Sequence, residues 1–173
     1  EYPVEVISAN FKTTENLLNY FCESKKLKKF IFSSTSEVYA STINRGFDKI
    51  PTNEKVLLSI DNIHNPRWSY AASKILSEVL INSIKIKFPK FNYLILRYHN
   101  IYGPGQKDHF IPEYLERLLM QNKNILYGND YRSYLYIDDA IAHTYKLGIN
   151  SKIKNEIINV GSNKCYSSIE IAN

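Results

Sequence analysis

Apolar stretches separated by polar breaks predict helices and strands that alternate along the chain. Apolar side chains recur every three or four residues over residues 10–27 and 69–87, which predicts two amphipathic helices. Short continuous apolar runs at 29–34 and 93–98 end in hydroxylated or polar residues and predict buried strands. A third run at 157–161 ends on a glycine and predicts a last strand.

The segments between these elements complete an α/β pattern. Residues 40–67 are polar and contain Gly46, Pro51 and Pro66, so they predict a long surface loop, a kind of segment that is usually functional. The weaker patterns predict a helix at 112–121, a strand at 125–127, a helix at 138–147 and a helix beginning at 167–170. Helices that alternate with buried strands predict a parallel sheet flanked by helices.

Both ends of the chain lead us to expect a piece of a longer protein. The first residue is Glu1 rather than Met, no charged-then-apolar leader follows it, and the chain opens into a helix with no strand before it. The helix that begins at 167–170 has no room to finish.

Composition is that of a globular protein of one ordinary domain, with 173 residues of which 44% are hydrophobic and 23% charged. No apolar run approaches the roughly 18–20 residues that span a bilayer, so we expect no membrane segment. Cys22 and Cys165 lie far apart and outside any metal-binding spacing, which favours a reducing compartment and a cytoplasmic location. The histidines show no paired-ligand spacing, so no metal is expected.

The formal net charge is +5, from 22 basic and 17 acidic side chains, and raises the question of nucleic acid. The one dense basic run, residues 25–29, is interpreted as the last turn of a helix followed by a solvated loop, because cations favour the negative end of a helix. No stripe of basic and aromatic residues continues it. Nucleic-acid binding is therefore a minority hypothesis, which steep salt-dependent binding to DNA would revive.

Four ordered blocks carry candidate chemistry. Tyr70 and Lys74 lie one helical turn apart, where an ammonium can favour the phenolate, although composition alone gives about one such pair by chance. The other three blocks are residues 33–39 after the first strand, 97–104 after the second, and 127–139 further along. The carboxyl ends of parallel strands are where α/β proteins place ligands.

With these blocks in this order, the chain resembles the extended short-chain dehydrogenase/reductases that modify nucleotide sugars, the NAD-dependent epimerase/dehydratase family. The resemblance runs from Asn10 in "NFKTTENLL" to "INVGSN" near the end. It implies part of a Rossmann-type sheet with its catalytic residues over residues 1–108, and over 109–173 a partial substrate-binding region interleaved with the last sheet strands. The six glycines form none of the family's glycine-rich patterns, so we expect that loop to be absent.

The resemblance also implies residue roles. Tyr70 would be the acid/base on a sugar hydroxyl, Lys74 would hold the nicotinamide ribose and help lower the tyrosine pKa, and Thr35 would bridge Tyr70 and the sugar. Ser36 and Glu37 would complete the catalytic set. The expected cofactor-lining residues are Asn10, Ser33, Ser34, Tyr70, Lys74 and Tyr98, and the expected substrate-binding residues are His99, Asn100, Tyr127 and Arg132. NAD would be the cofactor, with NADP left open, and a nucleotide-diphosphate sugar the substrate. A homodimer would form through the helices at 11–27 and 69–87.

The reaction subclass stays open. The expected activity is an NAD-dependent epimerase or dehydratase reaction, an isomerase or lyase step that begins with transient oxidation of a sugar hydroxyl. Thr35-Ser36-Glu37 resembles the Thr-Ser-Glu of UDP-glucuronate decarboxylases and departs at Ser36 from the Thr-Asp-Glu of dTDP-glucose dehydratases, which gives a decarboxylase as the alternative. An alternative of another class is a catalytically incomplete chain that only dimerises or binds a partner.

Overall fold

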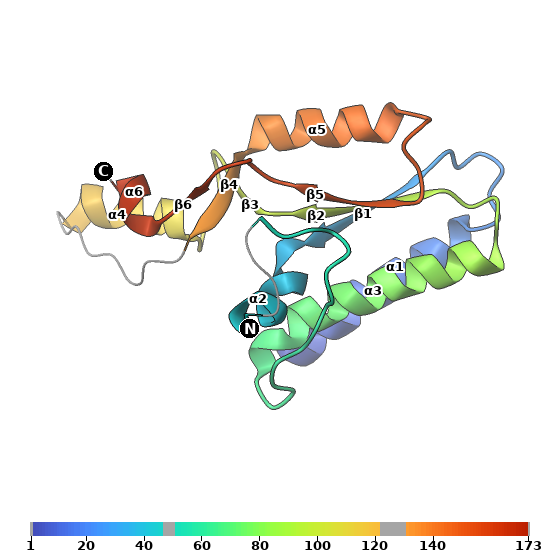
Figure 1. Ribbon diagram of the computed structural model, residues 1–173, viewed down its shortest axis with the longest axis horizontal. Helices are drawn as coiled ribbons and strands as arrows, with labels where there is room; N and C mark the ends of the chain where they lie inside the picture. Colours follow the sequence, from blue (N-terminus) through green and yellow to red (C-terminus); the bar gives the residue numbers. More distant parts are fainter. Residues whose placement is uncertain (1, 47–50, 122–130, 173) are drawn as a thin grey trace. The chain divides into compact units, whose positions relative to one another are not determined.

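A computed structural model describes residues 2–46, 51–121 and 131–172 (Figure 1). Its helices and strands are α1 (Pro3–Phe21), β1 (Phe30–Thr35), the 3₁₀ turn η1 (Ser36–Tyr39), α2 (Ala40–Asn44), the 3₁₀ turn η2 (Pro66–Trp68), α3 (Ser69–Lys87), β2 (Tyr93–Tyr98), β3 (Asn100–Tyr102), α4 (Phe110–Gln121), β4 (Arg132–Tyr136), α5 (Ile137–Ile149), β5 (Glu156–Val160), β6 (Cys165–Tyr166) and α6 (Ser168–Ala172). The chain forms two compact units, one of Glu1–Arg97 with Leu147–Asn159 and the other of Tyr98–Lys146 with Val160–Asn173.

The first unit contains a parallel three-stranded sheet in the order β1-β2-β5, together with the adjacent helices α1 and α3 (Figure 1). Its core is a cluster of buried apolar side chains from these helices, from β1 and β2 and from the segment before β2: Leu18, Phe32, Ile81, Phe91, Tyr93 and Ile95. The expected Rossmann-type sheet with flanking helices is confirmed. Strand β2 and helix α3 have the bounds that the hydrophobic pattern predicted.

Helix α1 differs from its prediction because it lies further towards the N-terminus. Pro3 opens it, at a position where a proline needs no amide hydrogen, and it ends at Phe21 rather than at Leu27. The lysines at 25–29 therefore lie in a loop, and their assignment to a last helical turn is wrong. Lys29 nevertheless binds a helix end: its Nζ donates to the carbonyls of Leu147 (2.9 Å) and Asn150 (2.8 Å) at the C-terminal end of α5.

The segment at 40–67 is less of a surface loop than its polarity suggested. It begins with α2 and reaches η2 at its end, and within it Ser41 and Thr42 are fully buried. Thr42 Oγ1 donates to the Leu57 carbonyl at 2.6 Å. Small hydroxylated side chains that satisfy each other and the backbone can be buried where a polarity pattern predicts exposure.

The second unit contains a sheet in the order β3-β4-β6. Strand β3 pairs in parallel with β4, Asn100 opposite Tyr134, and β4 pairs antiparallel with β6, Ser133 opposite Cys165. The hydrophobic pattern predicted none of these strands. Strands β3 and β6 are only three and two residues long, and in β4 the inward position 133 is a serine, which hides the alternation of period two. The predicted helices at 112–121 and 138–147 correspond to α4 and α5, and α6 follows the predicted start at 167–170.

The observed helices and strands do not test two further predictions, the strand at 125–127 and the division at residue 108. The strand predicted at 125–127 lies outside the described residues. The division at residue 108 concerned functional regions and stays a prediction, whereas the compact units change between Arg97 and Tyr98. Within the described ranges, none of the helices is long and apolar enough to cross a membrane.

Candidate active site

The end of β1 and the start of α3 bring three of the predicted catalytic residues into one place in the first unit. Thr35 closes β1, Tyr70 is the second residue of α3, and Lys74 follows one turn later on the same helix. Asn65 and Pro66 set the beginning of this helical segment, because the Asn65 side chain accepts from the Arg67 amide at 3.0 Å and Pro66 opens η2.

Lys74 links α3 to the end of β1. Its Nζ donates to the Ser33 carbonyl at 2.9 Å and lies over the rings of Phe32 and Tyr70, 5.0 and 5.7 Å from their centroids. Burial lowers the pKa of this ammonium. Since an ammonium has three donors and only one of them is used within the described part of the chain, Lys74 can hold ribose hydroxyls of the NAD that the sequence led us to expect.

Tyr70 is a half-buried phenol with two polar neighbours. Its side chain is 38% exposed, and burial raises its pKa, while a side-chain hydrogen bond with Thr35 acts in the lowering direction and the Glu37 carboxylate in the raising direction. The net direction is opposite to the lowering that we expected from Lys74. Burial outweighs the Thr35 hydrogen bond, which is the lowering influence on the Tyr70 pKa.

Thr35 is held in an orientation that suits a relay. Its Oγ1 accepts from the Glu37 amide at 3.2 Å, as the capping residue of η1. A hydroxyl that accepts on one side keeps its own proton for another partner, here the Tyr70 oxygen. Thr35 can therefore pass a hydrogen bond between the phenol and a substrate hydroxyl.

Glu37 and Ser36 lie in η1, directly after Thr35. Both are partly exposed, and Glu37 Oε2 lies 3.9 Å from Arg67 Nη2 in a loose surface ion pair. Such pairs contribute little to stability, so the carboxylate is free to face a ligand without loss of fold.

The predicted cofactor-lining residues of the first unit lie near the end of β1 and the start of α3. The side chains of two of them, Asn10 and Ser34, bind other protein groups. Ser33 presents its carbonyl to Lys74, as above. Asn10 Nδ2 donates to Ser73 Oγ at 3.0 Å and so ties α1 to α3. The Ser34 hydroxyl donates to Glu78 Oε1 at 2.5 Å, inside the protein. The side chains of Asn10 and Ser34 thus have contacts within the fold that the sequence pattern did not reveal.

The remaining predicted residues belong to the second unit. The Tyr98 and Thr144 hydroxyls are 2.6 Å apart, and the His99 amide donates to the Val160 carbonyl at 2.9 Å. Asn100 and Arg132 open β3 and β4, and Tyr127 lies outside the described residues. A Cβ on Gly161 would lie 2.9 Å from the His99 ring, so only glycine fits against this histidine.

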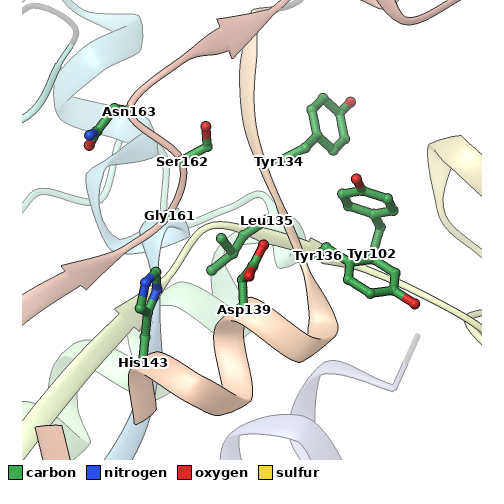
Figure 2. Close-up of a pocket in the computed structure, with 9 residues that line it drawn as sticks. All are labelled: Tyr102, Tyr134, Leu135, Tyr136, Asp139, His143, Gly161, Ser162 and Asn163. Carbon is green, nitrogen blue, oxygen red and sulfur yellow. The ribbon is translucent and has the colours of Figure 1, made fainter. Parts of the chain in front are cut away.

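The second unit also contains an open hollow of about 490 Å³ (Figure 2). Its lining residues come from β3, β4, α5 and the turn after β5: Tyr102, Tyr134, Leu135, Tyr136, Asp139, His143, Gly161, Ser162 and Asn163. Asp139 and His143 lie one turn apart on α5, and the ring of Tyr102 packs edge-on against the rings of Tyr134 and Tyr136. None of the predicted substrate residues that the structure describes lines it. The signal that could have found it is the Tyr-Leu-Tyr alternation of β4, which stood inside the block at 127–139.

Comparisons with known proteins agree with the resemblance seen in the sequence. Residues 1–161 match the model of the NAD dependent epimerase/dehydratase family. The chain is 34% identical over 178 residues to UDP-N-acetyl-alpha-D-glucosaminuronate decarboxylase of Bacillus cytotoxicus, which covers 99% of this chain and 52% of the relative. It is 35% identical over 160 residues to dTDP-D-glucose 4,6-dehydratase of Dictyostelium discoideum, covering 87% of this chain and 35% of the relative.

A solved structure gives the same result in three dimensions. UDP-glucuronic acid 4-epimerase from Bacillus cereus, in complex with UDP-glucuronic acid and NAD, aligns with a TM-score of 0.77 and 28% identity over 95% of this chain and 49% of that one. The chain thus spans about half the length of this epimerase and of the decarboxylase, and about a third of the dehydratase. Because the family match covers most of the chain, this protein belongs to the NAD dependent epimerase/dehydratase family.

Proposed function

We propose that this protein modifies a nucleotide-diphosphate sugar by transient oxidation of a sugar hydroxyl. The observation that carries the proposal is the arrangement of Thr35, Tyr70 and Lys74. The Tyr70 phenol has the Thr35 hydroxyl, at the end of β1, as a hydrogen-bond partner, and the Lys74 ammonium lies one helical turn away on α3. The residues fit NAD, which supplies the hydride acceptor when bound. The relatives' names describe an epimerase, a dehydratase and a decarboxylase, and a hydroxyl oxidation is a first step compatible with all three.

The chain's own residues have separate tasks in this step. Tyr70 takes the proton from the sugar hydroxyl at its phenol oxygen and later returns it. Thr35 donates to that oxygen and orients the hydroxyl. Lys74 favours the phenolate by its charge and offers its free donors to the ribose. Asn10, Ser33 and the backbones of Ser34 and Tyr98 are proposed to line the cofactor, since the Ser34 hydroxyl is bonded to Glu78 inside the protein.

Substrate recognition is assigned to the second unit. Arg132 is proposed to bind the diphosphate, because a planar guanidinium can bind two phosphate oxygens at once. His99, Asn100 and Tyr127 are proposed as further contacts with the nucleotide.

A decarboxylase is the second candidate, and Thr35-Ser36-Glu37 favours it. The Glu37 carboxyl group can transfer a proton on the oxidised sugar after the first step, since decarboxylation and dehydration both include a proton transfer at a ring carbon. An epimerase needs only rotation and return of the hydride. The 34% identity to a decarboxylase is consistent with this candidate and does not favour it over the main one, because the identity to a dehydratase is 35%.

Product analysis of the full-length protein tests the function and separates the subclasses. The enzyme is given NAD with UDP-glucuronic acid, UDP-glucose or dTDP-glucose, and products are identified by NMR. Inversion at a ring carbon identifies an epimerase, loss of CO₂ a decarboxylase and loss of water a dehydratase. Failure to convert any nucleotide sugar, with NAD bound, would contradict the proposal.

Glu37→Gln is the variant that reports on the subclass. In a decarboxylase or dehydratase it should slow the step after oxidation, so that absorbance of the reduced cofactor builds up while nucleotide-sugar binding stays near normal. In an epimerase it should change turnover only modestly. Asp61→Asn is the matched control, because Asp61 is also a carboxylate in a surface ion pair, with Arg45. Loss of substrate binding without reduced cofactor would contradict both subclasses.

Assembly and location complete the proposal. A homodimer through α1 and α3 is supported by apolar side chains that these helices leave exposed, among them Ile7, Leu17, Leu76 and Val79. A cytoplasmic location is supported by two cysteines that are free thiols in the structure, Cys22 and Cys165.

A further inference from the structure

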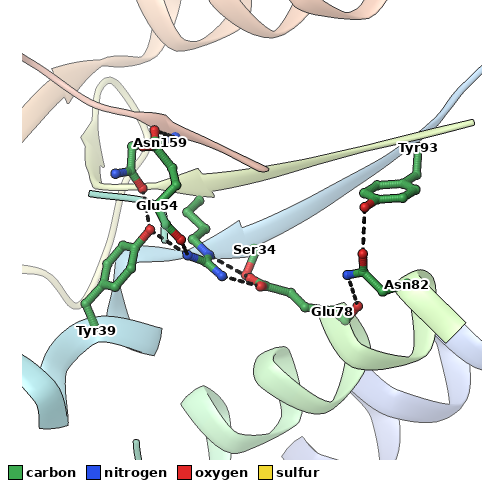
Figure 3. Close-up of polar contacts among 8 residues, drawn as sticks. Ser34, Tyr39, Glu54, Glu78, Asn82, Tyr93 and Asn159 are labelled. Carbon is green, nitrogen blue, oxygen red and sulfur yellow. Dashed lines mark hydrogen bonds and ion pairs between the residues drawn. The ribbon is translucent and has the colours of Figure 1, made fainter. Parts of the chain in front are cut away.

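A network of buried polar side chains lies beside the candidate active site in the first unit (Figure 3). Arg97 of β2 and Glu78 of α3 form a two-pronged ion pair, with Nη2 to Oε2 at 2.6 Å and Nε to Oε1 at 3.0 Å. Ser34 of β1 donates to the same Glu78 Oε1. Ser34 and Glu78 are each 4% exposed and Arg97 is 2% exposed, so the contacts are shielded from water.

Arg97 continues the network towards η1 and the segment before α3. Its Nη1 donates to the Tyr39 hydroxyl at 2.6 Å and to the Glu54 carbonyl at 3.0 Å. The Tyr39 hydroxyl in turn donates to Asn159 Oδ1 at 2.8 Å. The contacts of Arg97 with Glu78 and Tyr39 hold its pKa above the usual value although burial acts against the charge. The guanidinium is therefore a permanent cation in its contact with Glu78.

Burial of this ion pair is poorly explained by stability alone. Removing two charges from water carries a desolvation penalty, and apolar residues of similar size often serve stability as well or better. An apolar pair could not reproduce the geometry of these contacts, because the hydrogen bonds fix the distance and direction between the side chains of β1, β2 and α3.

The network meets the catalytic residues at the β1–α3 contact. Ser34 lies between Ser33, which accepts from Lys74, and Thr35, which bonds Tyr70. Glu78 lies one turn beyond Lys74 on α3. Ser33 and Ser34 of β1 are thus hydrogen-bonded to Lys74 and Glu78, one turn apart on α3. The next residue of β1 is Thr35.

We propose that Ser34 and Glu78, with Arg97 as the counter-ion, are positioning residues that set the register of β1 against α3 at which the Thr35 hydroxyl reaches the Tyr70 oxygen. This inference rests on the proposed function, in which Tyr70 is the base. It assigns the Ser34 side chain to alignment of the acid/base pair, whereas a cofactor-lining role would need its hydroxyl to face the ligand.

Ser34→Ala in the full-length enzyme tests the inference with little risk to folding, because it leaves the Glu78–Arg97 pair intact. Truncation of Glu78 or Arg97 would instead leave an unpaired buried charge and strongly destabilise the fold. We expect kcat to fall by about 10- to 100-fold, as small misplacements of catalytic groups do, with KM and the Kd for NAD by calorimetry near those of wild type. Because the Thr35 hydrogen bond favours the phenolate, the acid limb of the kcat profile should move to higher pH.

Tyr93→Phe is the matched control. The Tyr93 hydroxyl of β2 donates to Asn82 Oδ1 of α3 at 2.6 Å, so the variant also removes one hydrogen bond between a strand and α3, but one turn further from Tyr70 (Figure 3). We expect it to lower the melting temperature and leave kcat and its pH profile unchanged.

The outcomes separate this inference from the proposed function. If Ser34→Ala keeps kcat within about twofold of wild type, or weakens NAD binding in place of kcat, the positioning role is overturned. The same follows if Tyr93→Phe lowers kcat as much as Ser34→Ala does. If Tyr70→Phe also turns over normally, the proposed function itself fails.

Discussion

At the scale of single residues, burial acts on Tyr70 and Lys74 in opposite directions. It raises the pKa of the phenol and lowers the pKa of the ammonium, because in both cases the charged form is the one disfavoured. The sequence predicted that these two residues share a helical face. It could not predict how far they are removed from water, which depends on the packing of α3 against β1.

The lowered pKa of Lys74 predicts a pH dependence of stability. Between the folded-state pKa of Lys74 and its unfolded-state pKa of about 10.4, the unfolded state binds more protons than the folded state. The contribution of Lys74 to stability therefore rises with pH across this window, and it is lost as pH falls through the folded-state pKa. As pH rises through this window, the free energy of unfolding of wild type should therefore increase relative to that of Lys74→Met. Urea unfolding at a series of pH values measures the difference.

Lys87→Met controls for the loss of one positive charge from the same helix, because Lys87 is exposed at the end of α3. A difference between wild type and Lys74→Met that stays constant or shrinks as pH rises would show that burial does not disfavour the Lys74 ammonium.

At the scale of elements, α1 and α3 each have a buried side and a side that carries exposed apolar residues. Leu18 and Ile81 are buried in the core, whereas Leu76 and Val79 of α3 are 46% and 56% exposed. Exposed apolar residues on a helix whose other side is already buried mark a candidate interaction surface. This is the basis of the proposed dimer.

Val79→Glu should therefore weaken the dimer without harm to the fold. A carboxylate buried without a partner in an interface is strongly unfavourable, so we expect a dimer-to-monomer shift of the full-length protein at micromolar concentrations. Sedimentation velocity measures it. Ile141→Glu on α5 is the matched control, because Ile141 is 58% exposed and lies outside the two helices. A wild-type monomer, or a Val79→Glu variant that stays dimeric, would refute the assignment.

At the scale of the whole molecule, the hydrophobic pattern predicted the α/β class because β1, β2 and β5 each contain a short apolar run and α3 has clear periodicity. It missed β4 because Ser133 takes an inward position, and it missed the burial of Ser41 and Thr42 because their hydroxyl groups find partners only in the folded chain. The same limit applies to the site. Tyr70, Lys74 and Thr35 stand in a recognisable pattern, whereas the Ser34–Glu78–Arg97 network joins residues 44 and 19 positions apart.

Tyr70 is proposed as the base of a sugar oxidation, and the decisive variant is Tyr70→Phe in the full-length enzyme. The variant keeps the ring and its packing and removes only the proton acceptor, and Tyr145→Phe on α5 serves as the control for loss of an exposed tyrosine hydroxyl. We predict a fall in kcat of about 10²- to 10⁴-fold, with the melting temperature and the affinities for NAD and the nucleotide sugar near those of wild type. A Tyr70→Phe enzyme that retains more than about a tenth of wild-type kcat would show that Tyr70 is not the base.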